Sequence, residues 1–542
     1  MNITGIIVFG ILWFVFAYIY YGNKIKNKAL DCIKIDKLPS HEFQDEQDYV
    51  PTKTAILFGH HFSSIAGAGP IVGPILAFSL FGWLPAVLWI LIGSVFFGAV
   101  HDFSAMLVSV KNKGISIVEI AETAISKRAS TIFAIFVWLT LTLVEAVFAN
   151  LTASTVVDKP EIAIPTFGLI ALAIIFGYFV IRKNMNLVTG TILALIILGF
   201  LIYLGEIFPI VASYDFWLIL TFVYTFAAAI LPVWLLLQPR DYLSMYILII
   251  SLLFGLVGIL ILHPSINSPA FISFNSKSGP IFPILFIIIA CGAISGFHSI
   301  IASGTTAKQL DKIPDAKKIG FGGMLVEALL ALLVVMMVAS VLQWEGNGQF
   351  SFHDLLKKSP NIAFGTAYGS TLAVFGIPMF LGTSFGVLML NAFILTSLDT
   401  SARLNRYIVQ ETLGSRYKGI FKNKYFATSS SLVLALILCM SNGFKSLWPM
   451  FGASNQLIAA LTLFVVSAYI SGFKAPLRYT LIPAVLMLII TEAALFYQAV
   501  FTHFPTGNWV LFTLSVILFI SGLIVTIEAS KKLLINLKII KS

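Results

Sequence analysis

Long apolar runs separated by short polar loops recur along the 542 residues of the chain. A helix needs about 20 mostly apolar residues to cross the hydrocarbon of a membrane. Fifteen runs reach or approach this length, and they cover 4–21, 55–80, 83–109, 131–153, 163–181, 187–205, 217–237, 243–262, 281–302, 321–342, 377–400, 426–441, 447–471, 479–500 and 509–528. Residues 362–376 are a candidate for a further short helix at the outer surface. The pattern predicts an all-α polytopic membrane protein of about 15 transmembrane helices.

The basic residues give these predicted helices a direction across the membrane. If loop 22–54 is cytoplasmic and the sides alternate, 29 of the 34 Lys and Arg residues fall on the cytoplasmic side. The remaining ones are Lys159, Lys277, Lys357, Lys358 and Lys445. Cytoplasmic loops of membrane proteins are enriched in Lys and Arg, so we expect the N-terminus outside and the C-terminus in the cytoplasm. The net charge of +10 then follows from topology, and no nucleic-acid partner is needed to explain it.

Composition excludes several classes of protein. The chain is 58% hydrophobic and 11% charged, whereas a soluble domain carries about 25% charged residues. Cys32, Cys291 and Cys439 lie far apart without a CxxC pair, so neither a disulfide nor a zinc site is expected. The sequence has no GxxxxGK[ST] phosphate loop and no segment long enough for a soluble enzymatic or signalling domain. An ATP-driven pump with its own motor, a membrane sensor and an intramembrane enzyme are therefore disfavoured. We expect the first apolar run to be a retained span and not a removed signal peptide.

The second predicted span carries an unusual cluster of helix breakers, in the segment GAGPIVGP. Its members are Gly67, Gly69, Pro70, Gly73 and Pro74. Proline removes a backbone donor, and glycine lets the chain leave helical geometry. Close helix packing through small residues is the alternative interpretation. We predict a discontinuous helix, whose exposed half-helix ends attract an anionic group or a cation at mid-membrane.

Transporters built from inverted repeats carry a second broken helix at the matching position of the other half. Counting five spans on leads to 217–237, which contains Leu231 and Pro232. The span 281–302 runs in the same direction and contains Gly292 and Gly296. The sequence does not decide between them, although the usual offset of five favours 217–237.

Ionisable side chains inside membrane spans are costly and usually face a cavity or a partner. Candidates for proton coupling or gating are His60, His61, His101, Asp102, His298, Arg240, Asp241 and Asp399. His60, His101 and His298 fall at a similar depth in the inner third, and histidine changes its charge near neutral pH. The roles of Glu145, Glu327 and Glu492 stay open between structural hydrogen bonding and proton transfer.

Two other interpretations of these polar residues remain. Each histidine can be a hydrogen-bonded packing residue without a role in transport. A metal site built from His60, His101, Asp102 and His298 is the rival chemistry, but no HxxxH or HExxH spacing supports it. Arg240 and Asp241 are expected at the inner end of span 217–237, as an anchor or a gate.

Neutral polar residues around the predicted breaks are candidates for substrate binding. His60, Ser63, Ser64 and Gly67 follow helical spacing and form one stripe. Ser295, His298 and Ser299 form a second stripe. With the breaker residues and the amides near the C-terminal end, the set is Ser63, Ser64, Gly67, Gly69, Pro70, Gly73, Ser295, Ser299, Asn455 and Gln456.

Five long segments resemble the signature motifs of the carbon starvation protein A (CstA) family. They are FGHHFSSIAGAGPIVGPILA (58–77), VWLLLQPRDYLS (233–244), CGAISGFHSIIASGTTAKQL (291–310), LTSLDTSARLNRY (395–407) and LWPMFGASNQLIAAL (447–461). The resemblance runs from about residue 50 to 475, and the motifs occur in the expected order. The chain is shorter than the larger members, so features of their extra segments cannot be transferred.

The resemblance implies a bacterial inner-membrane transporter of the amino acid–polyamine–organocation superfamily, with a five-plus-five inverted repeat like that of LeuT. Members are associated with peptide uptake during carbon starvation, and relatives with proton-coupled pyruvate uptake. We then expect a peripheral helix and loop over 1–54, a core over 55–400 with repeats at about 55–205 and 217–400, and further helices over 401–542.

These observations favour a secondary transporter that imports small peptides or pyruvate with protons. We expect no cofactor; the coupling ion is H⁺, with Na⁺ not excluded. The partners are the substrate and the lipid bilayer. The alternative is a channel or passive facilitator for small carboxylates or amino acids, whose flux a proton gradient leaves unchanged.

Overall fold

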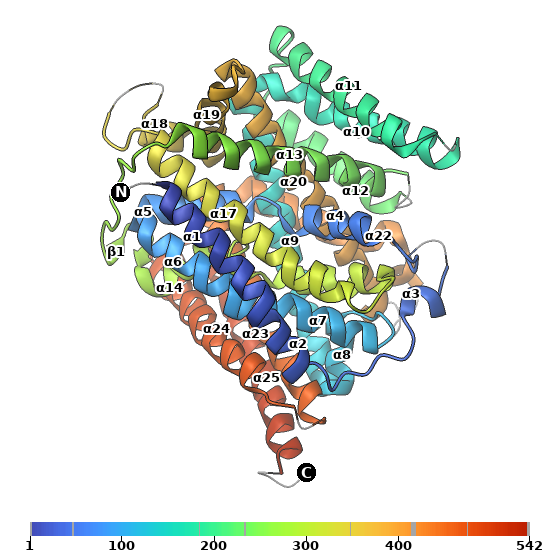
Figure 1. The fold of residues 1–542 in the computed structure, drawn as a ribbon. Coiled ribbons are helices and arrows are strands. Elements are labelled where there is room, and N and C mark those ends of the chain that lie inside the picture. The colour runs from blue at the N-terminus through green and yellow to red at the C-terminus, as the bar shows by residue number, and fades with distance from the viewer. Residues whose placement is uncertain are drawn as a thin grey trace.

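The computed structural model describes residues 3–45, 48–183, 185–231, 235–346, 348, 350–413, 419–473 and 475–538. Most of these residues belong to helices that pack side by side in one bundle (Figure 1). Two two-residue strands, β1 (Asn275–Ser276) and β2 (Gly279–Pro280), pair antiparallel in a loop. The predicted predominantly helical fold is confirmed.

In chain order, the helices are divided into those before the two strands and those after them. The first group comprises α1 (Ile3–Phe16), α2 (Gly22–Lys28), α3 (Pro39–Glu42), α4 (Thr54–Ile65), α5 (Gly69–Phe81), α6 (Trp83–Gly93), α7 (Ala99–Lys111), α8 (Ile117–Ala124), α9 (Lys127–Asp158), α10 (Ala163–Gly177), α11 (Leu187–Ile207), α12 (Tyr214–Ile230) and α13 (Leu237–Leu262). The second group comprises α14 (Ile281–Ile288), α15 (Gly296–Ile301), α16 (Ala307–Gln309), α17 (Gly322–Val341), α18 (Phe352–Lys358), α19 (Pro360–Leu372), α20 (Met379–Ile408), α22 (Lys424–Ser441), α23 (Phe444–Ser471), α24 (Arg478–Tyr497) and α25 (Trp509–Asn536).

Thirteen helical stretches of the described residues are long and apolar enough to cross a membrane. They correspond to thirteen of the fifteen predicted spans. The other two predicted spans differ from a simple crossing helix: 217–237 holds the 17-residue α12, and 281–302 is interrupted between α14 and α15. Large apolar side chains on the outer helices, such as Leu12, Val188 and Ile196, are more than 60% exposed. Such a face suits lipid and not water.

The loops gather at two ends of the bundle. We call the end that carries the segment before α4 and the loops after α7 and α16 the lysine-rich end. There, Ser40 donates to the Leu310 carbonyl (2.6 Å) and Tyr49 to the Lys113 carbonyl (3.1 Å). At the opposite end, the amide of Leu84 donates to the Ala270 carbonyl (3.0 Å). Figure 1 shows α3 and α8 at the lysine-rich end, and β1, α18 and the N-terminus toward the other.

Helices α10 and α11 form a hairpin at the edge of the bundle (Figure 1). Their interface is made by small residues: a Cβ on Gly168 would meet the Leu201 side chain (2.8 Å), and Gly205 lies against the Glu161 carbonyl. Most of the remaining surface of α11 is exposed. The hairpin therefore stands apart from the closely packed helices α5, α9, α17, α20 and α23.

Two sequence predictions change with the structure. Arg240 and Asp241 lie in the first turns of α13 and not at the end of the preceding span, because α12 already stops at Ile230. Leu231 is extended, and Pro232, the expected breaker, lies outside the described residues. The candidate helix at 362–376 exists as α19 but is almost wholly buried, packed against α20.

Candidate functional site

The second span is broken where the sequence predicts a break. Helix α4 ends at Ile65, and Ala66 leaves helical geometry with φ −77° and ψ 51°. Helix α5 begins at Gly69 with Pro70 in its first turn, a position where the missing proline donor costs nothing. The ends of both half-helices at the break are buried in the bundle, which is the condition for irregular backbone at membrane depth.

A second break lies in the span 281–302. Helix α14 ends at Ile288 and α15 begins at Gly296, so residues 289–295 connect two short half-helices. The segment contains Gly292, one of the two glycines singled out in the sequence. The structure thus shows a discontinuous helix at the second of the two places that the sequence left open.

The two breaks lie against each other, and glycines permit the contact. A Cβ on Gly73 would come within 2.5 Å of the Ile288 carbonyl oxygen, and a Cβ on Gly69 would overlap the Cys291 side chain. From the other side, a Cβ on Gly292 would lie 3.6 Å from the Pro70 Cα. Only glycine allows backbones to approach this closely.

Two neighbouring amides on α23 bind the backbone at the interrupted span. The Asn455 side chain accepts from the Phe297 amide (2.8 Å) and donates to the Ser295 hydroxyl (3.0 Å) at the start of α15. Gln456 donates to the carbonyls of Phe286 (2.8 Å) and Ile289 (3.2 Å) at the end of α14. The two side chains therefore satisfy groups that the break leaves without helical partners. Sequence reasoning assigned both amides to the substrate instead, and that role stays a prediction.

The side chains of the predicted serine stripes are buried. Ser63 and Ser64 donate to the carbonyls of Gly59 and His60, both at 2.8 Å. Ser299 donates to the Gly296 carbonyl (2.7 Å) and contacts the Thr462 hydroxyl (3.0 Å). These hydroxyl protons are engaged inside the protein, so each serine offers a ligand only its oxygen lone pairs.

A chain of charged side chains, which we call the ion chain, joins four helices. His60 on α4 lies 3.1 Å from Asp241, and Asp241 lies 3.0 Å from Arg240 on the same helix, α13. Arg240 also pairs with Asp399 on α20, whose other contact is the Tyr224 hydroxyl on α12 (2.6 Å). Asp241, Arg240 and Asp399 are buried, whereas the His60 side chain is 13% exposed.

A second group, the histidine–carboxylate cluster, joins α7, α15 and α17. Asp102 receives one contact from His101 (2.7 Å) and another from His298 Nδ1 (3.0 Å). The far nitrogen of His298, Nε2, lies 3.4 Å from Glu327. All four side chains are fully buried.

The three histidines predicted at one depth therefore divide between two groups. His101 and His298 share Asp102, whereas His60 belongs to the ion chain. His61 pairs with neither Asp102 nor Asp241, and its Nδ1 lies 2.8 Å from the Thr306 hydroxyl. The rival four-ligand metal site is not assembled as one group, because His60 pairs with Asp241.

The two other glutamates have different surroundings. Glu145 on α9 accepts from Asn405 and Ser431, both at 3.1 Å, so it links α9 to α20 and α22. Both carboxylate oxygens of Glu492 are buried without a hydrogen-bond partner among the described residues.

Sequence reasoning gave no site role to three residues that lie in or beside these groups. Tyr224 completes the ion chain, and Arg403 donates to the carbonyls of Ala228 (2.9 Å) and Leu231 (2.6 Å) at the end of α12. Cys291 lies within 4.8 Å of donor atoms of His298 and Glu327. Arg403 and Asp399 are four residues apart on α20 and therefore share a face of the helix, but no local pattern shows a contact across 175 residues of chain.

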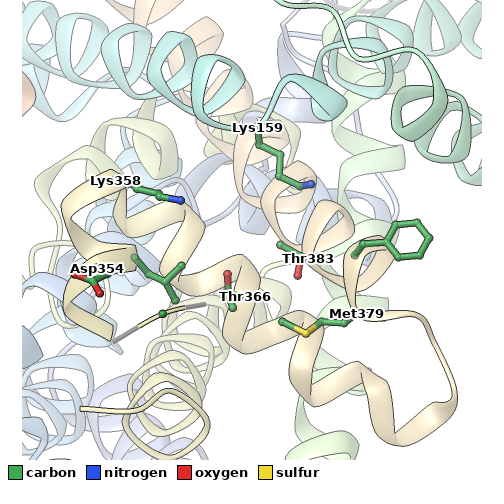
Figure 2. Close-up of a pocket in the computed structure, with 9 residues that line it drawn as sticks. Lys159, Asp354, Lys358, Thr366, Met379 and Thr383 are labelled. Carbon is green, nitrogen blue, oxygen red and sulfur yellow. The ribbon is translucent and has the colours of Figure 1, made fainter. Parts of the chain in front are cut away.

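A cavity of about 750 Å³ opens at the opposite end of the bundle, lined by α18, α19, α20 and the residue that follows α9. Figure 2 shows the amino groups of Lys159 and Lys358 directed toward it, with Thr366 and Thr383 between them. Lys159 also pairs with Glu161 (3.4 Å) and Glu206 (3.8 Å). The cavity therefore carries both signs of charge near its wall.

The fold is similar to that of a solved membrane transporter. The crystal structure of the Eremococcus coleocola manganese transporter superposes with a TM-score of 0.54 at 12% identity, covering 91% of this chain and 99% of that one. At this identity the similarity concerns the fold alone.

Sequence comparisons identify the family. The model of "Carbon starvation protein CstA" matches residues 2–352 and 349–494. The peptide transporter CstA of Bacillus subtilis is 32% identical over 98% of this chain and 97% of its own length. The pyruvate/proton symporter BtsT of Escherichia coli is 30% identical over 90% of this chain and 81% of its own length. The chain belongs to the carbon starvation protein CstA family.

Proposed function

We propose that this protein is a secondary active transporter that imports small peptides, pyruvate or both, coupled to protons. The CstA relatives are named peptide transporters, and BtsT is named a pyruvate/proton symporter. The observation that carries the proposal is the pair of broken helices, whose half-helix ends meet inside the bundle beside buried ionisable groups. Secondary transporters build their substrate sites in this way.

We propose a five-plus-five inverted repeat in which the α10–α11 hairpin is an insertion. With the hairpin set aside, the first repeat is α4–α5, α6–α7, α9, α12 and α13. The second is α14–α15, α17, α20, α22 and α23, so each repeat opens with its broken helix. The two broken helices run in opposite directions between the ends of the bundle, which an inverted repeat requires. This arrangement supports the span 281–302 as the symmetry mate, five core helices after the first break. The core that we propose runs from α4 to α23 and so extends beyond the expected range 55–400.

The substrate carboxylate, common to peptides and pyruvate, is proposed to bind at the start of α5. Backbone amides at a helix N-terminus carry partial positive charge and attract anions. The contact between the two breaks places this helix start beside the segment 289–295. Ser63, Ser64, Ser295 and Ser299 remain the candidates for polar contacts from the two stripes.

His60 is proposed as the coupling group. The ion chain holds two carboxylates and one guanidinium, so with both carboxylates ionised it is charge-balanced when His60 carries a proton. Among the charged members of the ion chain, His60 has the largest exposed fraction, 13%, which gives the proton a route to water. Release of that proton would leave one uncompensated charge beside α4, a change that favours rearrangement of the helix.

The orientation and location are part of the proposal. We propose that the lysine-rich end faces the cytoplasm of a bacterium and that the protein resides in the inner membrane. The cavity near Lys159 and Lys358 would then open to the outside, where the substrate arrives.

Uptake by purified protein in liposomes tests the function. An inward proton gradient should drive accumulation of labelled pyruvate or a dipeptide, and competition between them identifies the preferred substrate. His60→Gln should abolish accumulation while leaving exchange of internal and external substrate intact, because only coupling is lost. The proposal is wrong if neither compound accumulates, and the coupling assignment is wrong if His60→Gln accumulates substrate like the parent. A channel or facilitator would instead show flux that the gradient does not change.

A further inference from the structure

Three donor atoms of different chemistry converge where the span 281–302 is interrupted. Cys291 lies in the connecting segment, His298 in the first turn of α15 and Glu327 on α17. One donor atom from each lies within 4.8 Å of the others, and His298 Nε2 is 3.4 Å from Glu327. The three side chains are at most 3% exposed.

These donors include buried atoms without a hydrogen bond. His298 Nε2 and both carboxylate oxygens of Glu327 have no hydrogen-bond partner among the described residues. Their 3.4 Å separation is close, yet its geometry is not that of a hydrogen bond. A buried polar atom without a partner costs roughly 1–3 kcal/mol, so such atoms in one place indicate a ligand between them.

The other side of the His298 ring sets its orientation. Nδ1 faces Asp102 at 3.0 Å, and the second oxygen of Asp102 faces His101 at 2.7 Å. A proton on Nδ1 that is donated to Asp102 leaves the lone pair of Nε2 directed toward Glu327. Metal-binding histidines usually carry this kind of carboxylate contact on the nitrogen away from the metal.

We propose that Cys291, His298 and Glu327 form a binding site for a divalent transition-metal ion, with Zn²⁺ the best match. Ligand atoms at about 2.1 Å from a tetrahedral ion stand roughly 3.4 Å apart, the separation of His298 and Glu327. A thiolate and a carboxylate neutralise a doubly charged ion, so the loaded site is neutral inside the bundle. Sulfur and imidazole ligands suit zinc and disfavour Na⁺, Mg²⁺ and Ca²⁺.

This site departs from the metal-free expectation. It shares only His298 with the alternative metal site considered from the sequence, which also used His60, His101 and Asp102. The alternative is a proton shared between His298 and Glu327. It would explain the approach of these two side chains but not the position of the Cys291 thiol beside them. Gly69 leaves room for the thiol, because a Cβ there would overlap it. The polar contacts of the thiol are weak ones to Ser295 (3.5 Å) and Asn455 (3.9 Å). Three protein ligands leave a fourth position open to water.

Metal analysis of the full-length protein in detergent tests the site without any transport assay. After incubation with Zn²⁺ and gel filtration, the parent chain should retain about one ion. Co²⁺ in its place should give the absorption of a thiolate–cobalt bond. Cys291→Ser should lose this absorption, and Glu327→Gln should bind zinc at least 100-fold more weakly.

Cys439→Ser and Glu145→Gln are the matched controls, because they change a buried thiol and a buried carboxylate elsewhere in the bundle. Both should bind like the parent, and Zn²⁺ should raise their unfolding temperatures but not that of Cys291→Ser. The site is refuted if the folded parent retains no zinc, or if Cys291→Ser retains it with unchanged affinity. The result does not depend on which substrate is carried.

Discussion

Several buried charged side chains in this protein lie where another segment supplies a donor or an opposite charge. Asp315 at the lysine-rich end is an example outside the predicted spans: it accepts from Thr54 (2.5 Å) at the start of α4 and from Lys318 (2.8 Å). Burial acts to raise the pKa of Asp315, but the hydrogen bonds from Lys318 and Thr54 together hold it below its ordinary value. This carboxylate thereby anchors the first broken helix to the loop before α17.

Replacing Asp315 with asparagine should destabilise the protein by about 2 kcal/mol at neutral pH, because hydrogen bonds to a charged group are lost. The native carboxylate stays charged to lower pH than the unfolded one. Its stabilisation is therefore complete above the unfolded-state pKa of about 3.9 and fades as pH falls through the lower folded value. Unfolding temperatures of parent and variant in detergent should differ at pH 7 and converge as pH falls below the lowered folded pKa of Asp315. Asp311→Asn, which removes an exposed pair with His41 (3.0 Å), should change little at either pH.

At the scale of the element, proline and glycine were sufficient to predict the break between α4 and α5. For the break between α14 and α15 they left two possible places. The first break has two prolines among its glycines, whereas the connecting segment 289–295 contains Gly292 and no proline. Its irregular backbone depends on Asn455 and Gln456, more than 150 residues away. A local pattern cannot contain that information, so the sequence left two places open.

Alanine at Gly73 should disrupt the contact between the two breaks. The added Cβ would meet the Ile288 backbone oxygen, which cannot rotate away as a side chain can. We expect a loss of at least tenfold in uptake, with a lower unfolding temperature of the purified protein. Gly199→Ala on α11 is the control, since nothing lies within 4 Å of its added Cβ. Equal behaviour of the two variants would contradict the close approach of the breaks.

Variants of Asn455 can distinguish a structural role of the two α23 amides, Asn455 and Gln456, from a role in binding the substrate. If they bind the interrupted helix, Asn455→Ala should destabilise the protein by roughly 1–3 kcal/mol, the cost of a buried amide left unpaired. Asn455→Asp, which keeps an acceptor for the Phe297 amide, should recover part of that loss. A direct substrate role predicts a different result: unchanged unfolding temperature in the absence of substrate, with weaker substrate binding in both variants.

At the scale of the whole molecule, hydrophobic runs were sufficient to place most helices, but not their partners. Thirteen predicted spans match long apolar helices, because the length of an apolar run can be read from consecutive residues of the sequence. The ion chain and the histidine–carboxylate cluster depend on tertiary packing, so the sequence suggested their members without their pairing. The predicted shared depth of His101 and His298 agrees with their common contact to Asp102, while His60 pairs elsewhere.

The proposed orientation can be tested by labelling. In a chain without its native cysteines, a cysteine at position 34 should be protected from a membrane-impermeant maleimide in intact cells, because the lysine-rich end is proposed to face the cytoplasm. A cysteine at position 445 should react. Both should react after the membrane is permeabilised, and the reverse pattern in intact cells would invert the proposed topology.

The adjacent amides of α23 have a mechanical consequence. Because one side chain binds the start of α15 and its neighbour binds the end of α14, the two half-helices share a single anchor point. A tilt of one half against the other must then either break these hydrogen bonds or twist α23 with it. If the breaks are exposed to the two membrane faces in turn, α14, α15 and α23 would therefore move together as one rigid body. The hinge of that motion would lie elsewhere in the bundle.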